Sequence, residues 1–282
     1  MMSTATSKRS PTRPAPGDDR RRGAQTVHRA IDILEAFSID RPSLSLADIS
    51  TAVKLTVPTT HRLLKALRSK NMVGWDASSR RYSLGAGVMN LASVIIQRDD
   101  IVSISQPGLE RLRTKTGETV GIHWLVGEHR VCLVELTSPH QIRMASGVGR
   151  SYPLYAGASG KAILAWLPLE RVSRVIEEAI ESKALSGAQA RVVTTQLDEI
   201  RKRGFATSVG ETVPGAAAIA APILNSSHVV IGSINITGPA NRFNEERRKQ
   251  AIKPLVDVAA QVMGQLGRPT PIPSGYARAI PS

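Results

Sequence analysis

Apolar residues recur at helical spacing between residues 27 and 70, and the pattern predicts three amphipathic helices. Their apolar sides are formed by Val27, Ala30, Ile31, Leu34 and Phe37 in the first, by Leu46, Ile49 and Val53 in the second, and by Thr60, Leu63, Leu64 and Leu67 in the third. An apolar helix side needs a core to cover it, so the three helices are expected to pack on one another.

Local signals predict where these helices begin. Ser45 can cap the second helix while Asp48 reaches back to the cap, which is the spacing of a capping box. Residues 54–55 leave room only for a short turn. Pro58 is tolerated in the first turn of the third helix, because its missing amide hydrogen would have no intrahelical acceptor there.

Residues 72–75 and 80–84 follow as two short strands joined by a turn, which predicts a basic hairpin. Helix, turn, basic helix and hairpin in this order are typical of a winged helix-turn-helix, whose second helix enters the DNA major groove. A basic amphipathic helix alone is usually a solvated surface, but the full order favours DNA binding. The residues expected at the DNA are Ser45, Pro58, Thr59, Thr60, His61, Arg62, Lys65, Arg80 and Arg81.

Positive charge is concentrated in the same part of the chain. Residues 1–85 hold 15 of the 37 Lys and Arg and 7 of the 23 Asp and Glu, which gives +8 of the formal net charge of +14. Such a surface can neutralise phosphates. Residues 1–23 are basic and lack apolar periodicity, so we expect a disordered tail that attracts DNA weakly.

The length of 282 residues favours two domains. We expect a disordered basic tail over 1–23, a winged helix-turn-helix over 24–85, a linker helix over 86–99, a second domain over 100–267 and a flexible tail over 268–282. The apolar positions of the linker helix must be covered by a domain or by a second copy of the chain, which indicates a dimer. They are Val88, Met89, Leu91, Ala92, Ile95 and Ile96.

The second domain mixes both element types, so the fold class is α+β, with an antiparallel sheet flanked by helices. Strands are predicted over residues 119–126, 130–138, 142–148, 216–224 and 229–237. Helices are predicted over residues 101–116, 160–167, 169–182, 194–203 and 244–266.

Candidate chemistry in this domain is sparse, and we expect binding without catalysis, and no cofactor. The sequence has no nucleophile elbow, no complete Gly-rich phosphate loop and no zinc ligand set. His123, His129 and Cys132 lie near one hairpin with Glu128, but they flank a turn without a fixed geometry, so no metal site is expected. Lys161 follows a helix start whose free amides could bind an anion.

Cys132 is the only cysteine, which excludes an intrachain disulfide and fits a reducing cytoplasm. It lies in an apolar run, so we expect a packing role. No apolar run reaches the length of about 18 residues that a membrane helix needs. We therefore expect a soluble, cytoplasmic protein without a membrane partner.

A family resemblance covers nearly the whole chain, from about Ala24 to Gly267. The segments AQTVHRAIDILEAF, PTTHRLLKAL, RYSLGAGVMNLA, TGETVGI, GRSYPLYAGASGKAILA, RKRGFA and INITGPANRF resemble, in order, the isocitrate-lyase-regulator (IclR) family of bacterial transcription factors. The resemblance implies an N-terminal winged helix-turn-helix, a linker helix and a C-terminal GAF-like effector-binding domain. It also implies dimers or dimers of dimers on operator DNA, a small organic or aromatic acid as effector, and RNA polymerase as a further partner.

The resemblance places an effector pocket around residues 155–161, where Ala158 and Ser159 would offer backbone amides to a carboxylate. The implied set is Met144, Leu154, Tyr155, Ala158, Ser159, Ser208, Glu211, Ala216, Ala218, Asn235 and Thr237. Ser208 and Val209 stand where the family usually carries acids, which disfavours any ligand that needs an acidic partner there. The alanines at 216–218 leave space, so an aromatic or bulky acid is expected rather than a two-carbon one.

Two other classes of function stay open at this point. An enzyme could act on the ligand of the second domain, and it would return that ligand modified after long incubation. An architectural DNA binder could carry a vestigial sensor domain, and its DNA binding would not respond to any acid. Neither class explains the full order of motifs as well as a regulator does.

Overall fold

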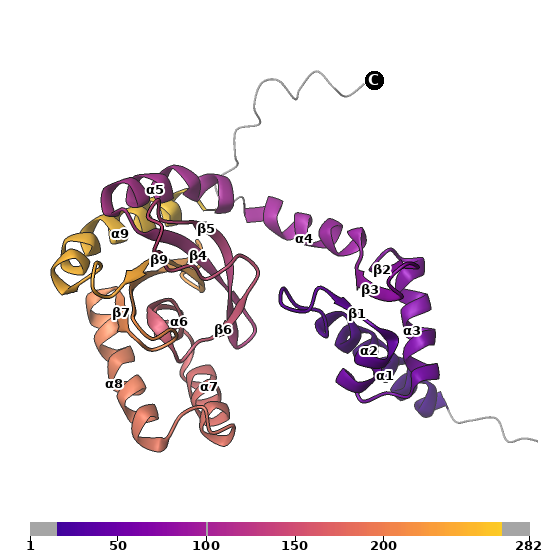
Figure 1. Ribbon diagram of the computed structural model, residues 1–282. Coiled ribbons are helices and arrows are strands. Elements are labelled where there is room, and N and C mark those ends of the chain that lie inside the picture. The colour runs from indigo at the N-terminus through magenta and orange to yellow at the C-terminus, as the bar shows by residue number, and fades with distance from the viewer. Residues whose placement is uncertain (1–15, 100, 267–282) are drawn as a thin grey trace, which may run out of the picture. The chain divides into compact units, whose positions relative to one another are not determined.

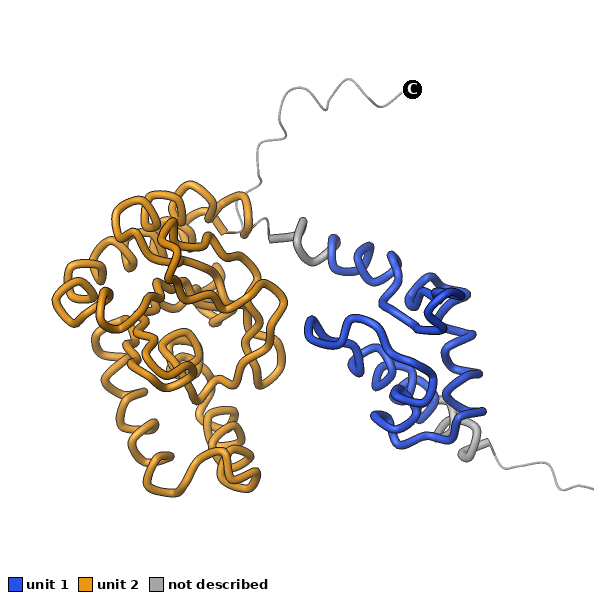
Figure 2. Tube along the Cα trace, viewed as in Figure 1, with its two compact units in different colours: residues 1–94 blue, residues 95–282 orange. Residues whose placement is uncertain are grey.

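The computed structural model describes residues 16–99 and 101–266, and the chain divides into two compact units, residues 1–94 and 95–282 (Figure 2). The expected tail over 268–282 and residues 1–15 of the expected N-terminal tail lie outside the described residues. The helix α4 (Ala86–Asp99) corresponds in position to the predicted linker and contains the division between the units.

The first unit packs three helices against a small antiparallel sheet (Figure 1). The helices are α1 (Pro16–Glu35), α2 (Leu46–Ala52) and α3 (Val57–Ser69). The strands are β1 (Ser43–Leu44), β2 (Val73–Asp76) and β3 (Arg81–Leu84), in the order β1-β3-β2. The core is formed by Ile33, Phe37, Leu44, Ile49, Leu63, Leu64, Val73 and Tyr82. This is the arrangement that the apolar pattern predicts.

The predicted capping box is confirmed. The Ser45 hydroxyl accepts a hydrogen bond from the Asp48 amide at 3.1 Å, and the Asp48 carboxylate accepts one from the Ser45 amide at 2.9 Å. Pro58 lies in the first turn of α3, as expected. The turn between α2 and α3 contains Lys54 in the left-handed region, at φ 52°. The capping box of α2, the turn at Lys54 and Pro58 together determine where α3 begins.

The expectation of disorder is wrong for residues 16–23, which lie in α1. Pro16 suits the first position of a helix, because φ is already restricted and the amide hydrogen is not needed. The composition of residues 1–23 gave no signal for this helix start.

The second unit is built on a six-stranded antiparallel sheet with the order β6-β5-β4-β9-β8-β7. The strands are β4 (Thr119–Val126), β5 (His129–Leu136), β6 (Ser151–Pro153), β7 (Ala206–Val209), β8 (Ala216–Leu224) and β9 (Val230–Pro239). The helices are α5 (Ile101–Thr116), α6 (Gly157–Leu164), α7 (Leu169–Glu181), α8 (Gly187–Arg203) and α9 (Glu245–Gln265).

The two faces of this sheet pack into separate cores. Helices α5 and α9 lie side by side and cover the face that carries Ile122, Ile219 and Ile234 (Figure 1). The opposite face carries Ala220 and packs against α6 and α8. Because successive strand residues point to opposite faces, the polar residues of β4 and β9 that alternate with the isoleucines face α6.

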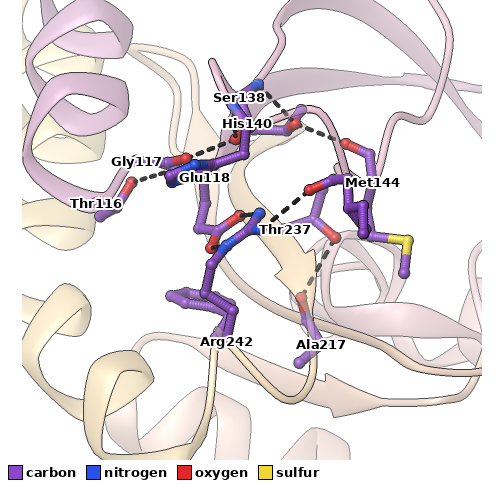
Figure 3. A network of polar contacts seen from close by, with 12 residues as sticks. Thr116, Gly117, Glu118, Ser138, His140, Met144, Ala217, Thr237 and Arg242 are labelled. Carbon is purple, nitrogen blue, oxygen red and sulfur yellow. Dashed lines mark hydrogen bonds and ion pairs between the residues drawn. The ribbon is translucent and has the colours of Figure 1, made fainter.

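A buried ion pair connects the core beneath α5 and α9 to the loop after β5. Arg242 makes two hydrogen bonds to the carboxylate of Glu118, at 2.6 and 2.8 Å, and Glu118 is only 1 % exposed (Figure 3). Arg242 also donates to the carbonyl of Ile142 at 3.0 Å, and the Thr119 hydroxyl donates to the carbonyl of Met144 at 2.6 Å. One arginine thus connects the start of β4, the loop after β5 and the segment before α9.

These contacts explain why the predicted strand over 142–148 is wrong. The carbonyls of Ile142 and Met144 bind side chains instead of a neighbouring strand, and residues 142–148 form an irregular loop. The next strand is β6, which pairs with β5. Helix α8 begins at Gly187, seven residues before the predicted start, because Ser186 and Gln189 form a second capping box.

Candidate functional site

Helix α3 separates a buried side from a cationic side. Leu63 and Leu64 are buried, at 6 % and 0 % exposure, whereas His61, Arg62 and Lys65 are exposed. Pro58 is also exposed and Thr59 is half-buried. The cationic side of α3 is therefore free to meet a negatively charged partner.

The expectation that Thr60 contacts DNA is wrong. Its side chain is 0 % exposed, and its hydroxyl donates to the carbonyl of Thr56 at 3.1 Å. Thr60 lies on the same side of α3 as Leu63 and Leu64, so its role is packing. Ser45 is half-buried and caps α2, and its contact with DNA stays a prediction.

The hairpin of β2 and β3 presents the two predicted arginines differently. Arg80 is exposed in the turn, at φ 52°. Nη2 of Arg81 lies 3.4 Å from the carboxylate of Asp48, and 43 % of the Arg81 side chain is exposed. Within the turn, the Asp76 carboxylate accepts hydrogen bonds from Ser78 and Ser79, which lower the pKa of that carboxyl to about 2.

In the second unit, the N-terminus of α6 is closed by side chains of the chain itself. The Gly157 amide donates to the carboxylate of Glu211 at 3.0 Å, and the Ala158 amide donates to the hydroxyl of Ser208 at 2.9 Å. Gly157 has φ +76°, a conformation that favours glycine. The expectation that the Ala158 amide is open to a ligand is therefore wrong for this structure, because the hydroxyl of Ser208 in β7 already accepts its hydrogen bond.

Lys161 completes this arrangement. Its side chain is 1 % exposed, and its Nζ lies 2.5 Å from Oε1 of Glu211 and 2.9 Å from Oε1 of Gln196. The carboxylate of Glu211 thus bridges the first turn of α6 and a buried ammonium. Lys161 belongs to an internal ion pair and not to a phosphate loop.

Several of the implied effector residues share the α6 face of the sheet. Ala218 pairs with Thr237 and Ala220 pairs with Asn235, so these side chains lie on one face. Thr237 donates to the carbonyl of Ala217 at 3.3 Å, and Ala216 and Ala218 are half-buried. Asn235 is 4 % exposed, and its Oδ1 has no hydrogen-bond partner among the described residues. A buried acceptor without a donor indicates a position where a ligand could donate.

Other implied residues are distributed elsewhere. Leu154 is 0 % exposed in the core beside α6, and its lining of the apolar side of a pocket stays a prediction. Ser159 is 4 % exposed, and its carbonyl accepts from the Ser233 hydroxyl at 3.1 Å. Met144 is half-buried in the loop after β5 (Figure 3). Its lining of a pocket stays a prediction.

A cavity of about 560 Å³ opens beside the N-terminus of α6. It lies among the loop before α6, the N-terminal half of α8 and the segment after β7. Tyr155 and Glu211 of the implied set line it, together with Ala156, Leu185, Val192, Val193, Gln196 and Gly210. This is space of the size that a small organic ligand occupies.

Arg130, which contacts the carbonyl of the cavity-lining Ala156, escaped the sequence analysis as a binding residue. Arg130 is 5 % exposed, and its guanidinium lies 2.9 Å from Nδ1 of His123 and 4.7 Å from the centre of the Tyr152 ring. Burial, with Arg130 beside it, holds the pKa of His123 well below its usual 6.5. No sequence signal marks Arg130, because charged residues are common at the start of a strand.

The metal arrangement considered around Cys132 does not form. His123 is buried against Arg130, whereas His129 is exposed. Across the described residues, no three His, Cys, Asp or Glu side chains gather in a way that could hold a metal ion. Burial raises the pKa of Cys132 to about 12, so the thiol is unreactive at neutral pH.

Within residues 16–99 and 101–266, no helix combines the length and apolarity needed to cross a lipid bilayer.

Comparison with known families agrees with both units. Residues 26–77 match the IclR helix-turn-helix domain, and residues 93–263 match the bacterial transcriptional regulator IclR C-terminal domain. The HTH-type transcriptional repressor AllR of Salmonella paratyphi A is 30% identical over 253 residues, covering 89% of this chain and 93% of the relative. AllR of Escherichia coli K12 is 30% identical over 255 residues, covering 87% and 92%.

Solved structures share the fold. A crystal structure described as an IclR transcriptional regulator from Silicibacter sp. TM1040 superposes with a TM-score of 0.79 at 24% identity, covering 87% of this chain and 98% of that one. An IclR homologue from Microbacterium hydrocarbonoxydans, complexed with 4-hydroxybenzoate, gives 0.71 at 21% identity, covering 86% and 98%. At these identities the likeness concerns the fold alone.

The ion pair beside α6 generates a stability prediction. Glu211→Gln should lower the free energy of unfolding of the second unit by about 3 kcal/mol, because it leaves the Lys161 ammonium buried without a counter-charge. Lys161→Met should cost less, because the carboxylate left behind belongs to a side chain that is 31% exposed and can be hydrated. Urea denaturation of the full chain measures both. A loss for Lys161→Met as large as that for Glu211→Gln would contradict the assignment.

Proposed function

The chain belongs to the IclR family of bacterial transcriptional regulators, and we propose that it represses its target genes by binding an operator through α3, under the control of a small organic acid. The helix-turn-helix identifies double-stranded DNA as its partner. The observation that carries the proposal is the exposed cationic side of α3, opposite a side that is fully packed. Repression is proposed because the AllR relatives are repressors.

The rest of the DNA interface follows from geometry. In a winged helix-turn-helix the second helix reads base edges while the wing contacts phosphate or the minor groove. Arg62 and Lys65 project from α3, and Arg80 projects from the turn between β2 and β3. We assign base contacts to α3 and backbone contacts to the turn.

A second copy of the chain is part of this proposal. Met89 and Leu91 of α4 are 74% and 59% exposed, and large apolar side chains on a helix favour a partner surface. A dimer, or a dimer of dimers, would place two recognition helices on a two-part operator. Bound there, this cytoplasmic regulator would control the access of RNA polymerase to the promoter.

The effector site is proposed on the α6 face of the second unit. Supporting observations are the cavity lined by Tyr155 and Glu211, and the unpartnered Oδ1 of Asn235. The related fold that holds 4-hydroxybenzoate supports an aromatic acid as the ligand class. An effector can shift DNA binding only by its different affinity for the two arrangements of the protein.

Replacing Arg62 tests the DNA interface. Arg62→Ala should lower the affinity for an operator, selected in vitro with the full-length protein, by about 1–3 kcal/mol if this side chain reads a base edge. A gel-shift titration at fixed salt measures the change. Arg191→Ala, which removes an exposed arginine of α8, should leave the midpoint unchanged. An unchanged midpoint for Arg62→Ala would remove Arg62 from the interface.

Ligand size tests the effector class. Ala216 and Ala218 lie on the same face of the sheet as Asn235 and have small side chains, so we expect a benzoate-like acid to bind more tightly than glyoxylate. Isothermal titration calorimetry of the full-length protein with benzoate, 4-hydroxybenzoate and glyoxylate gives the comparison. Glyoxylate binding that equals or exceeds that of the aromatic acids would overturn the preference for bulky acids.

A further inference from the structure

Arg130 is a buried cation without an acidic partner. Its side chain is 5 % exposed, it forms no ion pair within the described part of the chain, and its Nε has no hydrogen-bond partner there. Its remaining contacts are neutral: His123 at 2.9 Å, the ring of Tyr152 at 4.7 Å, and the carbonyl of Ala156 at 3.5 Å. Buried charges in proteins are normally paired, because removing a charge from water is costly.

The acidic side chains of neighbouring segments are engaged elsewhere. Glu128 pairs with Arg171 at 3.2 Å, and Glu211 pairs with Lys161. Glu135, further along β5, accepts hydrogen bonds from backbone amides of the following loop. These carboxylates therefore leave the charge of Arg130 uncompensated.

The titratable groups around Arg130 supply no negative charge either. Burial raises the pKa of Cys132 to about 12 and that of Tyr152 above its usual 10. His123 is neutral at pH 7, because burial lowers its pKa. These three groups therefore do not compensate the charge of Arg130.

Arg130 lies beside the N-terminus of α6. A Cβ placed on Gly157 would be 3.3 Å from Nη2 of Arg130, and Ala156, whose carbonyl the guanidinium contacts, lines the cavity of about 560 Å³. The first amides of α6 are already bonded to Glu211 and Ser208. Arg130 is therefore an uncompensated positive group that contacts a residue lining a cavity of ligand size.

We propose that the guanidinium of Arg130 anchors the carboxylate of the effector, and that the effector is a monocarboxylic acid. The proposal rests on the acid-controlled function proposed above and assigns the residue that recognises the acid. A guanidinium offers a planar pair of donors that matches a carboxylate, and the bound acid supplies Nε with the acceptor it lacks. One acid group compensates the single positive charge, whereas a second carboxylate would find no counter-charge, since Lys161 is already paired with Glu211.

The stability of the ligand-free protein distinguishes a ligand-binding role of Arg130 from a purely structural role. If Arg130 serves only to hold β5 to the loop before α6, Arg130→Met must destabilise the ligand-free protein. If Arg130 is kept for a ligand, Arg130→Met removes an uncompensated buried charge while retaining most of the side-chain volume. We therefore expect the ligand-free variant to melt at the same temperature as the wild type or higher.

Ligand binding supplies the second measurement. Acetate, pyruvate, benzoate and 4-hydroxybenzoate are each compared with the corresponding neutral amide, by thermal shift and calorimetry on the full-length protein at constant ionic strength. At least one acid should bind the wild type better than its amide. Arg130→Met should weaken that acid about tenfold or more and leave the amide unchanged, since a hydrogen bond to a charged group contributes at least that factor.

Two further variants complete the design. Arg130→Lys keeps the charge but loses the paired donors, so it should retain part of the preference for the acid over the amide. Arg191→Met, which removes an exposed arginine of α8, should behave like the wild type. The proposal is overturned if ligand-free Arg130→Met is less stable than the wild type, if it binds the acids as the wild type does, or if no acid is preferred to its amide.

Operator binding by the same proteins separates this proposal from the function on which it rests. Arg130→Met should still bind the selected operator, but without a response to the acid. A wild-type protein that binds an acid through Arg130 yet binds no DNA would contradict the regulator function and leave the anchor in place. A response to the acid that persists in Arg130→Met would contradict the anchor and leave the regulator function in place.

Discussion

The packing of Leu63 and Leu64 against α1, α2 and the small sheet decides which side of α3 faces outward. Because these leucines and Thr60 are buried, the helix can turn neither His61 nor Arg62 into the core. The same contact orients the hairpin of β2 and β3, which packs into this core through Val73 and Tyr82. The position of the cationic side chains of α3 therefore depends on buried apolar contacts that do not themselves touch DNA.

In the second unit, buried charge has a comparable role. Glu118 with Arg242, and Glu211 with Lys161, join segments far apart in the sequence, and each pair is internally compensated. Paired ions of this kind fix geometry more than they add stability. Arg130 differs from them, because the chain provides no counter-charge for it in the described residues. An uncompensated cation is more easily understood as part of a binding site than as part of the scaffold.

The sequence predicted elements whose causes are local. The capping box at Ser45 and the proline in the first turn of α3 each depend on a few neighbouring residues. It failed where a distant partner decides: the carbonyls of residues 142 and 144 bind Arg242 and Thr119, so the segment is a loop. For the same reason the closure of α6 by Glu211 and the isolation of Arg130 could not be anticipated, because both depend on how separate strands meet.

Hydrogen–deuterium exchange of the full-length protein, alone and with an operator fragment selected by it, tests the account most directly. Contacts with DNA should slow exchange in α3 and in the turn between β2 and β3, because both would lose access to water and open less often. Helices α7 and α8 should exchange at the same rate in both states. Protection confined to the second unit, or unchanged exchange throughout residues 57–81 in the bound protein, would contradict the assignment of α3 as the element that reads DNA.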